Sequence, residues 1–109
     1  MDWLVQFTQS ALGTLREISD RRIRRLILSR AEELGREPHA LSTPLQGELS
    51  GYRSIRAVGQ RYRIVFQIDE GRRQVTIIAV GIRREGHRRD IYALAQRLIR
   101  LGLVEPPQD

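Results

Sequence analysis

Arginines and one tyrosine in the second half of the chain are the residues best suited to chemistry on a charged substrate. Arg53, Arg56 and Arg63 fall in two neighbouring apolar segments, Arg83 follows a third, and Tyr92 comes shortly afterwards. A guanidinium group is a planar, charged fork that binds phosphate oxygens in pairs, and an aromatic ring can stack on a nucleobase. This combination is typical of a nucleic-acid site. The alternative is a solvated sheet face on which arginine is simply a long, soluble side chain.

The positive charge is concentrated in one part of the chain. Residues 51–100 hold 12 Arg against 4 Asp or Glu, a net +8, whereas residues 1–50 hold 7 of each. The last nine residues add two acidic groups, and the overall net charge is +6. Fixed cations gathered on one unit displace counterions from a polyanion, so this asymmetry favours a nucleic-acid partner. All 19 basic residues are arginine, which binds anions well but is a poor general base because it remains protonated.

Other chemistries find little support in the sequence. There is no cysteine, and His39 and His87, the only histidines, lie far apart, so we expect no metal site and no cofactor. We expect each histidine to be an exposed loop residue. The longest apolar stretch, residues 77–82, is too short for a membrane span, and no signal peptide is visible at the N-terminus. We therefore expect a soluble, cytoplasmic protein without membrane contact.

Hydrophobic periodicity predicts the elements that carry these residues. The expected elements are a strand at 3–7, helices at 11–18 and 20–34, a loop at 37–49, strands at 52–58, 61–68 and 74–80, and a helix beginning after Asp90. This order, β-α-α-β-β-β-α, predicts an α+β fold with a mainly antiparallel four-stranded sheet, an N-terminal helical hairpin and a C-terminal helix. We expect a single domain at residues 1–104 and a flexible tail at residues 105–109.

Local signals refine this arrangement. Asp20 and Asp90 are predicted N-caps, and Leu26 belongs to the predicted apolar stripe of the second helix. Helices are expected largely on one face of the sheet, which leaves Arg63 on an open opposite face. Tyr92, beside a buried stripe, either fills the edge of the core or points to that open face.

Five sequence pieces, taken in order and spacing, resemble the RelE/ParE superfamily of small bacterial toxins. The pieces are Leu45-Gln-Gly47, the strand with Arg53 and Arg56, Tyr62-Arg63, Val80-Gly-Ile-Arg83 and Asp90-Ile-Tyr92. The RelE branch of this superfamily contains ribosome-dependent endoribonucleases that cut mRNA. The ParE branch poisons DNA gyrase with a similar fold and lacks the ribonuclease residues.

The resemblance also implies roles for individual residues. By position, Arg63 is similar to the arginine that contacts the scissile phosphate, Arg83 to the arginine at the leaving group, and Tyr92 to the aromatic that stacks on the substrate nucleotide. Arg53 and Arg56, on a strand where that branch often carries lysines, are expected to bind substrate, as is Arg61. Without lysine, the general base would have to be Tyr92, His87 or a ribosomal group.

These roles predict a toxin of a type II toxin–antitoxin system that cleaves mRNA on the ribosome and leaves 2′,3′-cyclic phosphate and 5′-hydroxyl ends. The implied partners are a cognate antitoxin, mRNA and the ribosome. Two alternatives stay open: a ParE-like gyrase inhibitor without nuclease chemistry, and a basic nucleic-acid-binding module unrelated to toxicity.

Overall fold

The computed structural model describes residues 2–104, and the predicted tail at 105–109 lies outside them. The elements, in chain order, are β1 (Leu4–Phe7), α1 (Gln9–Arg16), α2 (Arg21–Glu33), α3 (Pro38–Leu41), β2 (Thr43–Pro44), the 3₁₀ turn η1 (Gly47–Leu49), β3 (Arg53–Ala57), β4 (Tyr62–Asp69), β5 (Gln74–Ile82) and α4 (Ile91–Arg100). No helix within residues 2–104 has the length and apolar character needed to span a bilayer.

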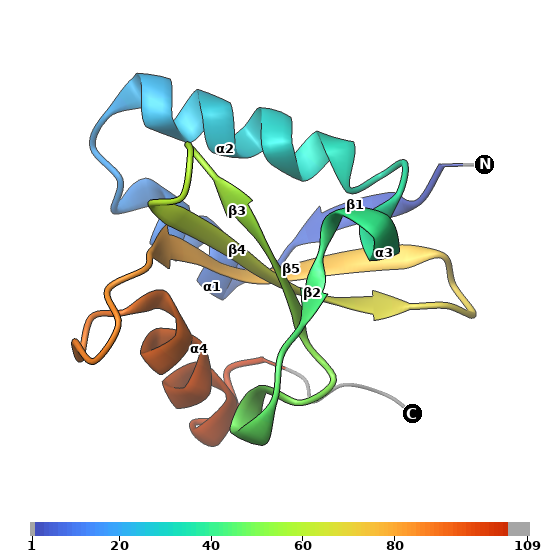
Figure 1. Ribbon diagram of the computed structural model, residues 1–109. Helices are drawn as coiled ribbons and strands as arrows, with labels where there is room; N and C mark the ends of the chain where they lie inside the picture. Colours follow the sequence, from blue (N-terminus) through green and yellow to red (C-terminus); the bar gives the residue numbers. More distant parts are fainter. Residues whose placement is uncertain (1, 105–109) are drawn as a thin grey trace.

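One mixed sheet runs through the middle of the molecule (Figure 1), with the strand order β1-β5-β4-β3-β2. β1 is parallel to β5, and the other neighbours are antiparallel. The α+β class and the mainly antiparallel sheet are confirmed, but the sheet has five strands among the described residues where four were predicted. The additional strand, β2, is only two residues long and includes Pro44, so it has no alternating pattern from which it could be predicted.

The helical hairpin of α1 and α2 covers one face of the sheet. Asp20 caps α2 by accepting a hydrogen bond from the Arg22 amide at 2.8 Å, as predicted. Ile27 and Ala31 of α2 are buried against the sheet, whereas Leu26 is 54% exposed, so its predicted place in the apolar stripe is wrong. The alternation of β4 places Tyr62, Ile64 and Phe66 in a first core on this face, where they pack with buried residues of the hairpin such as Leu15 and Ile27.

The opposite face of the sheet is not open as predicted, because α4 packs on it. Ile91, Ala95 and Leu98 of α4 form a second core with Val65 of β4 and Ala79 of β5. β4 and β5 are apolar on both faces near their middle, and a bulge between Val65 and Phe66 marks the change of register. Apolar groups on both faces require a cover on each side. The prediction of helices largely on one face is therefore wrong.

α4 covers this second face only in part. Its N-terminus, capped by Asp90 as predicted, begins beside the end of β5, and β3 lies beyond it with Ser54 and Arg56 on the same face. The part of the face beside β3 that α4 leaves uncovered stays accessible, and the side chain of Arg30 from α2 reaches its edge. The side chain of Arg63 lines this part.

Candidate nucleic-acid interface

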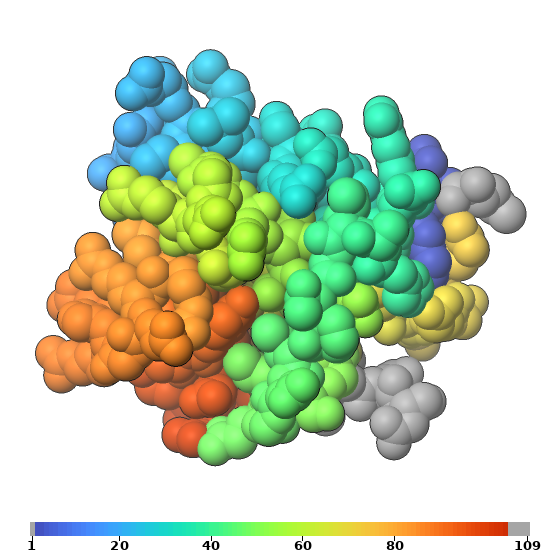
Figure 2. All heavy atoms as spheres, in the orientation of Figure 1, coloured from blue at the N-terminus to red at the C-terminus, as the bar shows by residue number. Residues whose placement is uncertain are grey.

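A shallow hollow of about 490 Å³ lies where α2, the chain around β2, β3, β4 and the start of α4 meet. Its lining residues are Arg30, Leu41, Thr43, Leu45, Ser54, Ile55, Arg56, Arg63 and Tyr92. Figure 2 shows the face on which the green segment before β3, the yellow-green β3–β4 turn and the orange segment before α4 come together. None of the lining side chains is a carboxylate. The hollow is therefore built to accept negative charge.

Arg56 and Arg63 form a cross-strand pair inside this hollow. They stand directly opposite one another in the β3–β4 register, and Arg56 is exposed. One Arg63 nitrogen, Nη1, donates to the carbonyls of Gln60 at 2.6 Å and Tyr62 at 3.1 Å, which leaves its remaining donors available. Like charges directly opposite each other are unfavourable in a sheet. An anion between the two guanidinium groups would remove that repulsion.

Arg30 of α2 is a third guanidinium at the hollow, and the sequence reasoning missed it. Its Nε donates to the carbonyl oxygen of Arg56 at 2.9 Å, and its Nη1 is paired with Glu33. The helical period held a signal for this position. Arg30 comes three residues after the buried Ile27 and four before the buried Leu34, which places it on the flank of the packed stripe.

Tyr92 forms one wall of the hollow and is half-buried. Its hydroxyl shares a 2.8 Å hydrogen bond with Oγ of Ser54, a buried side chain of β3. Its ring lies under Arg83, whose Cζ is 4.6 Å from the ring centroid, the geometry of a cation–π contact. Tyr92 thus packs beside the second core and also faces the hollow, so it combines the two alternatives drawn from the sequence.

Asp90 holds Arg83 in this position. Its carboxylate accepts from Nη1 of Arg83 at 2.7 Å, from the Arg84 amide at 2.5 Å and from the Tyr92 amide at 3.2 Å. Burial alone would raise the pKa of Asp90, but these three hydrogen bonds and the charge of Arg83 outweigh it, and the pKa lies below its usual value. The hydrogen bond from Nη1 of Arg83 to the Asp90 carboxylate also raises the pKa of the Arg83 guanidinium.

Two of the predicted substrate-binding residues lie apart from the hollow. Arg53 is on the hairpin side of β3, where its Nε donates to Oγ of Ser42 at 2.6 Å and its Nη2 to the carbonyls of His39 and Ser42. Arg61 is exposed in the β3–β4 turn, and its carbonyl accepts from the Arg83 amide at 2.8 Å. Arg56, Arg63 and Tyr92 are brought together, and Arg83 joins them through the ring of Tyr92.

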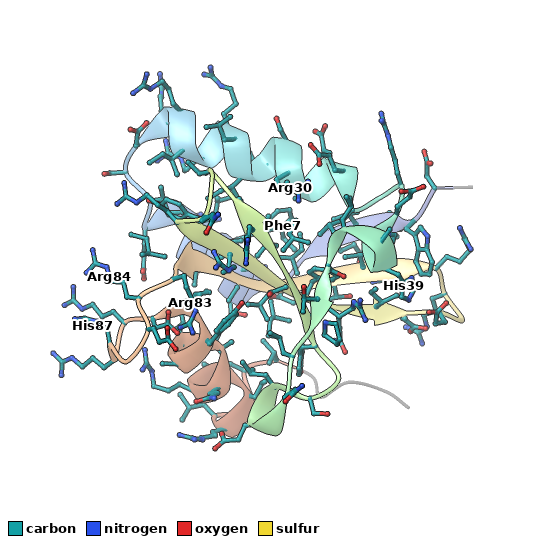
Figure 3. All side chains as sticks on the ribbon, viewed as in Figure 1. Phe7, Arg30, His39, Arg83, Arg84 and His87 are labelled. Atoms are coloured by element: carbon teal, nitrogen blue, oxygen red, sulfur yellow. The ribbon has the colours of Figure 1, made fainter. Side chains whose placement is uncertain are left out.

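Neither histidine faces the hollow. Figure 3 shows Arg83 turned inward at the start of α4, whereas Arg84 and His87 project outward from the loop. His87 is exposed, and its Nδ1 accepts from the Arg89 amide at 3.0 Å. His39 contacts Trp3 and Glu70 at the other end of the molecule. Residues 2–104 contain no cluster of three acidic or histidine side chains that could hold a metal ion.

Known proteins resemble this chain in sequence and in fold. The family model for the ParE toxin of type II toxin-antitoxin systems (parDE) matches residues 5–87. Toxin RelG of Mycobacterium tuberculosis is 33% identical over 92 residues, which cover 84% of this chain and 98% of RelG. These matches and the arginine-lined α+β domain define a small bacterial-type toxin. The chain belongs to the RelE/ParE superfamily of toxins from type II toxin–antitoxin systems.

Solved structures agree with this assignment. A chain of the RelBE2 toxin–antitoxin complex from Mycobacterium tuberculosis matches with a TM-score of 0.69 and 32% identity, over 76% of this chain and 93% of that chain. The free form of an arginine-to-alanine double mutant of the Escherichia coli toxin RelE matches with a TM-score of 0.67 and 20% identity, over 93% and 99% of the two chains. At this lower identity the second match establishes the fold alone.

Proposed function

We propose that this toxin is a ribosome-dependent mRNA endoribonuclease that inhibits translation. The observation that carries the proposal is the hollow itself, because Arg30, Arg56 and Arg63 line it without a carboxylate and Tyr92 forms its wall. Guanidinium groups suit the phosphates of a single strand, and a tyrosine ring suits stacking against an unpaired base. A single-stranded RNA fits this hollow better than a duplex does, because its bases are free to stack.

The proposed reaction is transfer of the phosphoryl group within the RNA strand. The ribose 2′-oxygen attacks the adjacent phosphorus and loses its proton, and the bond from phosphorus to the 5′-oxygen breaks as that oxygen gains a proton from water or from the group that accepted the 2′-hydroxyl proton. The products are a 2′,3′-cyclic phosphate and a free 5′-hydroxyl. In this scheme Arg63 and Arg56 bind the phosphate and stabilise its extra negative charge in the transition state. Tyr92 orients the nucleotide, and Arg83 supplies positive charge beside the leaving oxygen.

The hollow supplies no obvious general base. Its lining contains no lysine, histidine or carboxylate, and arginine stays protonated. The proton of the 2′-hydroxyl would pass to Tyr92 or to a group of the ribosome. We therefore expect slow cleavage of free RNA and much faster cleavage on the ribosome, where the strand is also held in place.

We further propose that a cognate antitoxin binds and silences this toxin in the cytoplasm, where ribosomes work. Two structural relatives support this. One was solved as the RelBE2 toxin–antitoxin complex, and the RelE mutant was also solved with a peptide of its antitoxin RelB. The net charge of +6 favours an acidic partner.

Inhibition of DNA gyrase is the second candidate, because the matching family model is that of the ParE toxin. Controlled expression in bacteria separates the two. The nuclease proposal predicts that incorporation of labelled methionine stops within minutes while plasmid supercoiling is unchanged. Early loss of supercoiling with continued protein synthesis would favour gyrase. Normal growth would contradict both and leave a basic nucleic-acid-binding module.

A further inference from the structure

The loop between β5 and α4 is closed at its base by one carboxylate. Residues 84–89 are all exposed and have hydrogen bonds of their own, such as the His87 amide to the Arg84 carbonyl at 2.9 Å. Asp90 lies below this loop with only 6% of its side chain exposed. The loop is therefore exposed while the carboxylate at its base is buried, and this carboxylate caps the start of α4.

The Asp90 carboxylate connects the two sides of the loop. Oδ2 accepts from both the Arg83 guanidinium and the Tyr92 amide, and Oδ1 accepts from the Arg84 amide. One end of this network is the segment directly after β5 and the other is the first turn of α4. Because Arg83 also lies over the ring of Tyr92, the carboxylate fixes the two partners of the cation–π contact relative to each other.

A helix cap alone does not require this arrangement. Serine or asparagine would cap α4 about as well without a charge. A carboxylate this deeply buried is unfavourable unless it is paired, and here the partner is Arg83, itself about three-quarters buried. The ionised group therefore has a second role besides capping.

We infer that Asp90 is a positioning residue that holds Arg83 over Tyr92 at the edge of the hollow, in the orientation that the cleavage reaction uses. This inference rests on the proposed function, since it concerns the same site. It adds a residue that does not line the hollow and is not proposed to touch RNA. Its effect on cleavage passes through Arg83.

The test compares full-length variants in single-turnover cleavage of a synthetic mRNA on purified ribosomes. Asp90→Asn keeps a capping group and removes the charge, so we expect cleavage to slow by about tenfold. In the Arg83→Ala background the same substitution should change the rate by less than about twofold, because the residue through which it acts is absent. Asp20→Ala, which removes the N-cap of α2 far from the hollow, is the matched control for lost stability and should cleave at the wild-type rate.

The NMR signal of Arg83 tests the position of its side chain without a measurement of cleavage. Stacking over the Tyr92 ring shifts the NMR signal of the Arg83 Hε proton upfield. Tyr92→Leu removes the ring, so its spectrum gives the unstacked position of this signal. We expect Asp90→Asn to return the signal toward its unstacked position and Asp20→Ala to leave it unchanged.

These measurements distinguish a failure of the positioning role of Asp90 from a failure of the proposed ribonuclease function. An unchanged Arg83 signal and an unchanged cleavage rate in Asp90→Asn would overturn the positioning role, as would an equal loss of cleavage in the Arg83→Ala background. Faster cleavage would also overturn it, because Asp90 would then compete with phosphate for Arg83. If the wild type does not cleave mRNA, the proposed function fails, and the Arg83 signal alone decides the role of Asp90.

Discussion

At the scale of single residues, the hollow gathers positive charge that the described residues neutralise only at Arg30, which is paired with Glu33. Arg56 and Arg63 face each other across β3 and β4, Arg30 lies beside them, and none of the lining side chains is acidic. Such an arrangement costs stability in the absence of a bound anion. A surface that only needed solubility would mix the two signs of charge, so the cost itself points to a ligand.

This cost can be measured directly. We expect Arg56→Gln to raise the free energy of unfolding by about 0.2–1 kcal/mol at low ionic strength, because it removes one member of the like-charged pair. The gain should shrink at high salt, where the repulsion is screened. Urea denaturation measures both. Arg36→Gln, which removes an exposed charge outside the hollow, is the control and should change stability little. A loss of stability in Arg56→Gln at low salt would mean that the pair is not repulsive.

At the scale of elements, the site depends on how α4 begins. Asp90 joins the end of β5 to the first turn of α4, and Tyr92 reaches across to Ser54 of β3. The hydrogen bonds to Asp90 stabilise its ionised form in the fold. The start of α4 is therefore sensitive to acid.

The sign of this sensitivity follows from the direction of the pKa. The pKa of Asp90 is lower in the folded chain than in the unfolded chain, where it is about 3.9. Ionised Asp90 therefore stabilises the fold above that value, and the contribution is lost as the pH falls through the folded value. We expect the difference in unfolding free energy between wild type and Asp90→Asn to be largest at neutral pH and to shrink below about pH 4.

Urea denaturation across that range checks this expectation. Glu32→Gln, which removes an exposed carboxylate of α2, is the control for the general effect of charge. A difference between wild type and Asp90→Asn that stays constant from neutral to acidic pH would show that the ion pair with Arg83 does not contribute to stability.

The elements also show what the sequence could and could not predict. Alternation in β4, the helical period of α2 and the caps at Asp20 and Asp90 depend on local rules, and all were predicted correctly apart from Leu26. The two-residue β2 depends on pairing with β3, and the side on which α4 packs depends on apolar groups exposed on the second face. Both are set by contacts between distant segments, which no local pattern records.

The same distinction applies to the candidate site. Residue type and order predicted a site with Arg56, Arg63, Arg83 and Tyr92, and the structure brings these four residues together. Arg53 was expected beside them, but the strand period turns it to the hairpin face, where Ser42 binds it. Ser54 was missed because its place at the hollow depends on how β3 and α4 pack, whereas Arg30 was missed although the helical period of α2 puts it on the flank of the buried stripe. The cap at Asp90 was predicted, whereas its ion pair with Arg83 depends on the path of the loop between them.

At the scale of the whole molecule, the fold brings together basic residues from both halves of the sequence. The excess of +8 lies in residues 51–100, and the first 50 residues are neutral. Arg30 nevertheless comes from the neutral half and joins Arg56 and Arg63 at one hollow. The proposed RNA-binding surface therefore combines the C-terminal half of α2, the β3–β4 hairpin and the start of α4. A toxin with this surface is expected to act on RNA as a complete domain.

The most direct test of that claim is to map mRNA 5′ ends after controlled expression of the wild type, Arg83→Ala and Arg84→Ala in bacteria. Arg83 lies over Tyr92, whereas its neighbour Arg84 is exposed and points outward, so the two variants lose the same charge at adjacent positions. We predict new 5′-hydroxyl ends inside translated regions for the wild type and Arg84→Ala, and at least about a tenfold loss of them for Arg83→Ala. Growth arrest by the wild type without new 5′-hydroxyl ends, or equal cleavage by all three proteins, would contradict the proposed ribonuclease site.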